Sequence, residues 1–170
     1  MEDTKVWIER ALDDCRHLKS EFIASQKWVV VPVESGLHFD ERDAERIAWS
    51  ARRANQATLR AVLLEKLKDV EDNVPVKATK EGLLAFNKQY GHFNCVLVPP
   101  DFSFAIVCST DDYYLVAGRP DFVRSAFGVE ISEASEKFAE FARNEAWSAE
   151  DRARLLGVHA RYSHFEQGNP

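Results

Sequence analysis

The stretch from His92 to Gly128 constrains the fold most, because it holds three consecutive strand-like runs and a helix signal. The runs are rich in β-branched and aromatic residues and span Phe93 to Val98, Phe102 to Ser109 and Tyr113 to Ala117. Turn-forming residues separate them at Pro99-Pro100-Asp101 and Ser109-Thr110-Asp111-Asp112. The pattern predicts an antiparallel meander of three strands.

Both faces of this meander are apolar. Cys95 and Leu97 alternate with Val96 and Val98 in the first run. An antiparallel sheet with one wet face would alternate polar and apolar residues, so we expect this sheet to be covered on both sides. A helix should follow at once, beginning near Pro120 and ending at Gly128.

The remaining segments add one strand and several helices. Trp28 to Val33 is an apolar run of strand length, and Pro32 indicates a sheet edge or a strand end. Helical patterns run from Glu2 to about Ser25, Glu41 to about Val70 with a kink or break near Arg52 to Thr58, Lys80 to Tyr90, and onward from Ser132 and from Ser148. The fold class predicted is α+β, with an antiparallel sheet of three to four strands covered by helices.

Size and composition predict a single domain over residues 1–170, with a disordered tail at 167–170. Three cysteines do not indicate a disulfide framework, and neither a signal peptide nor a membrane span is visible, so we expect a cytoplasmic protein. The net charge is −6 without a basic cluster, which argues against nucleic-acid and membrane partners.

The two cysteines of the meander are the first candidates for chemistry. A tight hairpin would place Cys95 and Cys108 nearly opposite each other, as a redox pair or with one as a nucleophile beside His92. His92 and Cys95 are three positions apart, however, and would point to opposite faces of a regular strand. Since free cysteine is among the most buried residue types, we interpret both as core residues.

Metal and anion sites are the next candidates. His38-Phe39-Asp40 offers two ligands from a loop, but no third ligand is evident nearby, and we predict no metal and no cofactor. Arg119 beside the helix start at Pro120 is a possible anion site, which Asp121 would weaken by binding the same amides.

These observations favour a non-enzymatic interaction or regulatory domain of the inhibitor, immunity or adaptor type, because no catalytic constellation is visible. Its partner would be a protein or a second copy of the chain, and the acidic composition favours a basic partner. The alternative is a small-molecule or anion sensor, or an enzyme, with a sheet-lined pocket near Arg119, Cys108, Tyr114 and His92. No motif indicates a family.

Overall fold

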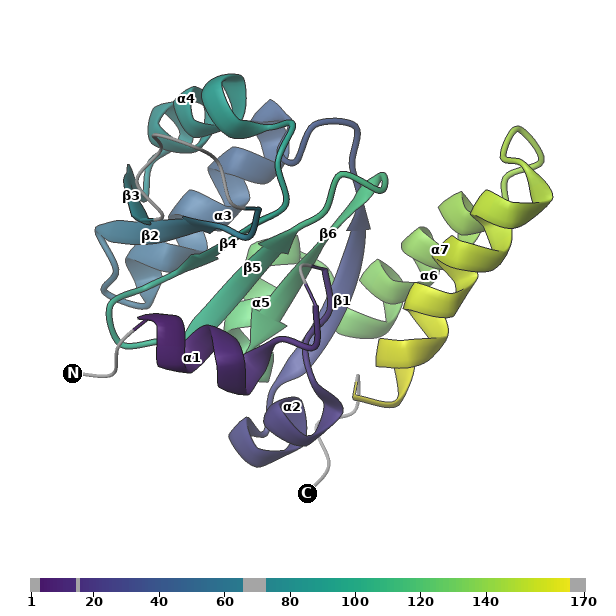
Figure 1. Cartoon of the computed structure of the whole chain (residues 1–170), viewed down its shortest axis with the longest axis horizontal. Coiled ribbons are helices and arrows are strands. Elements are labelled where there is room, and N and C mark those ends of the chain that lie inside the picture. The colour runs from purple at the N-terminus through teal and green to yellow at the C-terminus, as the bar shows by residue number, and fades with distance from the viewer. Residues whose placement is uncertain (1–3, 15, 66–72, 166–170) are drawn as a thin grey trace.

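The computed structural model describes residues 4–14, 16–65 and 73–165, and an antiparallel sheet forms its centre (Figure 1). Within these residues the sheet has six strands in the order β1-β6-β5-β4-β2-β3. They are β1 (Val29–Glu34), β2 (Thr58–Leu63), β3 (Asn73–Lys77), β4 (Cys95–Val98), β5 (Phe104–Cys108) and β6 (Tyr113–Gly118). The α+β class is confirmed, and the prediction of three to four strands was too low.

Helices cover both faces of this sheet, as the apolar alternation predicted. They are α1 (Thr4–Ala11), α2 (Ser20–Gln26), α3 (Glu41–Arg53), α4 (Lys80–Tyr90), α5 (Pro120–Phe127), α6 (Ile131–Ala142) and α7 (Ala149–Tyr162), followed by a 3₁₀ turn at Ser163–Phe165. In Figure 1, α1 lies in front of the sheet and α5 behind it. Cys95 and Leu97 belong to the core beneath α3, α4 and α5, whereas Val96 and Val98 belong to the core on the opposite face.

The meander and its following helix are confirmed. β4, β5 and β6 pair antiparallel in sequence, with Leu97 opposite Ile106 and Ile106 opposite Val116. α5 ends at Gly128, which has the left-handed φ of 67°. β1 pairs with β6 at one edge of the sheet, where Pro32 needs no amide partner on its outer side.

The predicted helix from Glu41 to about Val70 is correct only in its first part. α3 ends at Arg53, within the predicted break, and Asn55 then takes a left-handed φ of 59°. The chain continues as β2, which pairs with both β3 and β4, so the second predicted helix was wrong over Leu59 to Leu63. The predicted residues 66–70 lie outside the described residues.

The helix predicted from Glu2 to about Ser25 is also divided. The Asp14 carboxylate accepts the backbone N–H groups of Arg16 and His17 at 2.7 and 2.8 Å, which gives the chain a turn between α1 and α2. The helices predicted at Lys80 and Ser148 are confirmed, with Thr79 and Ser148 accepting backbone amides as N-caps. The predicted tail at 167–170 lies outside the described residues.

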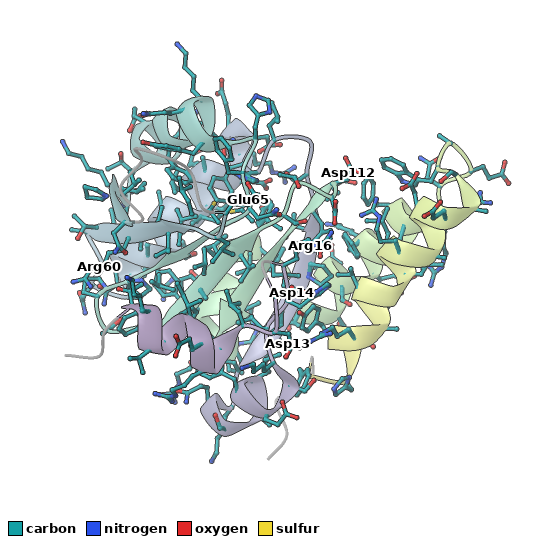
Figure 2. The ribbon with its side chains drawn as sticks, in the orientation of Figure 1. Asp13, Asp14, Arg16, Arg60, Glu65 and Asp112 are labelled. Carbon is teal, nitrogen blue, oxygen red and sulfur yellow. The ribbon has the colours of Figure 1, made fainter. Side chains whose placement is uncertain are left out.

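Polar side chains attach α7 to the turn between α1 and α2 and to the turn between β5 and β6. Figure 2 shows Asp13, Asp14, Arg16 and Asp112 along the boundary between the sheet and the α6–α7 pair. Arg161 pairs with Asp13, and Arg154 of α7 donates to the Asp111 carbonyl at 2.7 Å. The Leu18 N–H donates to the Tyr162 hydroxyl oxygen at 3.0 Å. No helix in residues 4–14, 16–65 and 73–165 has the length and apolar character to cross a membrane.

Candidate functional site

An open groove of about 720 Å³ lies between the loop of residues 34–40, α4, and the turn that joins α6 to α7. We call it the acidic groove. Its lining residues are Glu34, Ser35, Gly36, Leu37, His38, Phe39, Asp40, Asp43, Leu84, Asn87, Lys88, Asp112, Phe141 and Trp147. Leu37 is 55% exposed and adds apolar surface beside the aromatic side chains of the groove. The volume is typical of ligand sites in proteins.

Carboxylates dominate the charge of the acidic groove. Glu34, Asp40 and Asp43 form no ion pair with any described residue, while Asp112 lies 3.5 Å from Arg154. Lys88 is the only lysine or arginine among the groove's lining residues. The groove therefore presents uncompensated negative charge beside apolar side chains.

Asp43 is the carboxylate whose protonation is most affected by the fold. Burial, and then the neighbouring carboxylate of Asp40, raise the pKa of Asp43 to about 6. The Tyr114 hydroxyl donates to Asp43, which opposes this increase, and the positive charge of Arg46 opposes it as well. Asp43 therefore titrates close to neutral pH, so the charge of the groove changes in that range.

Hydrogen bonds fix the loop that forms one wall of the groove. Asn87 of α4 donates to the carbonyl of Leu37 at 2.5 Å and to that of Phe39 at 2.6 Å. The Ser35 hydroxyl donates to the His38 carbonyl at 2.6 Å. His38 has a φ of 57°, a left-handed conformation that costs free energy in a residue other than glycine. The surrounding bonds thus hold His38 in one position with its side chain 2% exposed.

That position places His38 beside the two cysteines of the meander. Cys95 and Cys108 are directly opposite each other on β4 and β5, and both are fully buried. His38 Nε2 lies 3.9 Å from Cys95 Sγ and 3.0 Å from the Phe93 carbonyl oxygen. One ligand-capable atom from each of the three side chains falls within 4.8 Å of the other two. We call these residues the His-Cys-Cys cluster.

The two thiols of the cluster have different acidities. Burial alone would raise the pKa of Cys95, but hydrogen bonds from Cys108 and His38 lower it to about 6. Burial, and the hydrogen bond to Cys95, raise the pKa of Cys108. Cys95 is therefore the thiol that ionises first.

The four site residues considered from the sequence do not form one site. Cys108 and Tyr114 are paired across β5 and β6 on the face beneath α3. His92 is exposed in the turn before β4, away from the buried thiols. Arg119 is exposed beyond the opposite end of β6, where it begins α5.

Arg119 lines a separate hollow of about 270 Å³ together with Arg53, Asp121 and three serines. The Asp121 carboxylate accepts from Arg124 at 3.2 Å. No side chain caps the start of α5, so the expected competition from Asp121 for the helix amides is not seen. The two arginines give this hollow a positive character.

The sequence predicted His38 as a possible metal ligand together with Asp40, and its proximity to Cys95 and Cys108 was not predicted. It was recognised as a loop ligand, but its neighbours Cys95 and Cys108 are 57 and 70 positions away in the chain. The histidine considered beside the thiols was the exposed His92, which lies three positions before Cys95. The sequence signal for the cluster was limited to two cysteines on neighbouring strands and one histidine in a distant loop.

Comparison with protein-family models, with curated proteins and with solved structures gives no match to this chain.

Proposed function

We propose that this protein is a non-enzymatic binding domain that holds a basic, partly apolar segment of a protein partner in the acidic groove. One observation carries the proposal: three carboxylates without ion-pair partners among the described residues, Glu34, Asp40 and Asp43, stand beside the exposed Leu37 in a groove of about 720 Å³. Lysine or arginine side chains of a partner would neutralise these carboxylates.

The apolar part of the groove supplies the second element of recognition. Leu37 and Leu84 lie on one side, and Phe141 and Trp147 line the groove as well. Trp147 is held in place because its indole N–H donates to the Phe141 carbonyl at 3.1 Å. Aromatic side chains with fixed orientation are typical anchors in protein interfaces.

Site-specific photo-crosslinking in the cells that make the protein tests the proposal. A photoreactive phenylalanine replaces Leu37 in the groove, and a matched control carries it at Val6 of α1, which is similarly exposed at 48%. We expect a discrete crosslinked partner at Leu37 that is absent at Val6, with lysine or arginine in the captured peptide. Equal labelling at both positions, no discrete product at Leu37, or an acidic captured segment would contradict the proposal.

The captured segment, made as a peptide, then measures the role of charge. Glu34→Gln and Asp40→Asn each remove one carboxylate, and asparagine still caps α3. We expect each to weaken binding by roughly two- to fivefold, with a reduced dependence on salt. Glu81→Gln, on α4 outside the groove, should leave the affinity unchanged.

A further inference from the structure

We propose that His38, Cys95 and Cys108 bind one zinc ion between the sheet and the loop of residues 34–40. Their ligand atoms lie within 4.8 Å of one another and all three residues are buried. The proposal is independent of the partner-binding function, because it concerns the buried cluster and not the charges of the groove.

The spacing of the cluster is close to that of a zinc site. A tetrahedral zinc ion with Zn–S bonds of about 2.3 Å and Zn–N bonds of about 2.0 Å holds its ligand atoms roughly 3.5 to 3.8 Å apart. His38 Nε2 and Cys95 Sγ are already 3.9 Å apart. A contraction of a few tenths of an ångström to about one ångström, within reach of side-chain rotation, would complete the arrangement.

The hydrogen bonding of His38 is the second observation. Nε2 is the ring nitrogen of His38 that contacts Cys95, so Nε2 would be the zinc ligand. Zinc bound there would replace the contact between Nε2 and the Phe93 carbonyl oxygen at 3.0 Å. Nδ1, which is buried without a hydrogen-bond partner among the described residues, would then carry the proton of the neutral imidazole.

Charge decides which ion fits. Two thiolates and one neutral imidazole carry a charge of −2, which Zn²⁺ cancels and Cu⁺ does not, and a buried site strongly disfavours residual charge. Calcium and magnesium prefer oxygen ligands, which the cluster lacks. Binding forms two Zn–S bonds and one Zn–N bond, and any proton that either thiol still carries passes to solvent.

Access to the cluster comes from the loop. His38 lines the acidic groove as well as the cluster, so opening of the loop would expose the thiols. Three protein ligands leave the fourth position of a tetrahedral ion for a water molecule. Zinc would also cross-link the loop to β4 and β5 and so stabilise that wall of the groove.

Cobalt(II) and zinc titrations test the site directly. The protein is prepared with Cys15→Ser, which leaves Cys95 and Cys108 as its only cysteines. It is stripped with a chelator under reducing conditions and refolded with one equivalent of either ion. We expect one ion per chain by native mass spectrometry, and for cobalt a sulfur-to-metal charge-transfer band with the visible absorption of tetrahedral coordination. Zinc should displace the cobalt and remove both bands.

Variants then assign the ligands. His38→Asn, Cys95→Ser and Cys108→Ser should each weaken zinc binding by on the order of 100-fold or more, measured by competition with a chromophoric chelator. His92→Asn is the matched control and should bind as the parent does. A parent protein that refolds with cobalt but shows no charge-transfer band overturns the proposal without any variant. Binding that survives Cys108→Ser unchanged also overturns it.

Discussion

Cys95 and Cys108 stand directly opposite each other on neighbouring antiparallel strands, with both thiols buried between the sheet and its helices. The pairing follows from the short turn after Pro99-Pro100, which sets the register of β4 against β5. The same register places Tyr114 beside Cys108 on the third strand. Cys95, Cys108 and Tyr114 therefore form a row across three strands beneath α3. At the end of this row the Tyr114 hydroxyl donates to Asp43 of α3.

Burial should keep both thiols of the metal-free protein slow to react with a thiol reagent, even though the pKa of Cys95 is lowered to about 6. Reaction requires local opening of the fold, so we expect rates on the order of 100-fold or more below those in denaturant. A colorimetric thiol assay on the Cys15→Ser protein measures this. Rapid, stoichiometric labelling of either cysteine would show that the native cluster is accessible.

Truncation of the central core should be costly. Leu97 pairs with Ile106 and is fully buried, so Leu97→Ala should lower the free energy of unfolding by about 2 to 5 kcal/mol in denaturant titrations. Leu37→Ala, at the exposed groove residue, should change it by less than about 0.5 kcal/mol. A loss below about 0.5 kcal/mol for Leu97→Ala would show that the core lies elsewhere.

The meander was predictable because its strand runs, turns and alternation all agree, whereas β2 was not. Leu59, Val62 and Leu63 have the i, i+3, i+4 spacing of a helix, yet Leu59 and Leu63 face one core and Val62 faces the other. Ala61 completes the alternation but is too good a helix former to reveal it. Pairing with β3 and β4 decides the outcome, and local sequence does not encode that pairing.

The candidate site also has one part that the sequence predicted and one part that it did not. The opposition of Cys95 and Cys108 followed from one hairpin and was anticipated. The approach of His38 depends on Asn87, which holds the loop from a helix about 50 residues later in the chain. Sites built by such long-range bonds leave little trace in local patterns.

One buried hydrogen bond should contribute to the attachment of α7 to the α1–α2 turn, beside the Arg161–Asp13 ion pair. Tyr162→Phe leaves the Leu18 N–H without its acceptor and should lower the free energy of unfolding by about 1 to 3 kcal/mol. Tyr90→Phe is the control, since the Tyr90 hydroxyl makes no hydrogen bond with any described residue. Equal stabilities of the two variants in parallel denaturant titrations would argue against the Tyr162 bond.

The affinity of the groove for a basic peptide should rise with pH. Between pH of about 5 and 7 the Asp43 carboxyl, with its pKa of about 6, loses its proton and adds a negative charge to the groove. Fluorescence anisotropy of the captured peptide should therefore show tighter binding at the higher pH. Asp43→Asn should flatten this dependence, and an unchanged pH profile in that variant would place the titrating group elsewhere.

Asp43 should also make the folded state less stable as pH rises. Its pKa is about 6 in the folded protein against 3.8 as the ordinary value, so the folded state binds more protons between these limits. Stability is then lost as the pH increases from about 4 through 6. Because solvent partly screens this half-buried carboxyl, we expect a loss of about 1 to 2 kcal/mol.

Comparison of two variants isolates this contribution. Asp43→Asn cannot ionise, so its stability relative to the parent should increase by that amount between pH of about 4 and 7.5 in denaturant titrations. Tyr114→Phe acts in the opposite direction: it removes the hydroxyl that donates to Asp43, so the pKa of the carboxyl should rise further and the loss should become larger. Parallel stability curves for the parent and Asp43→Asn would mean that Asp43 titrates alike in the folded and unfolded chains, and that its burial in the first turn of α3 does not control its charge.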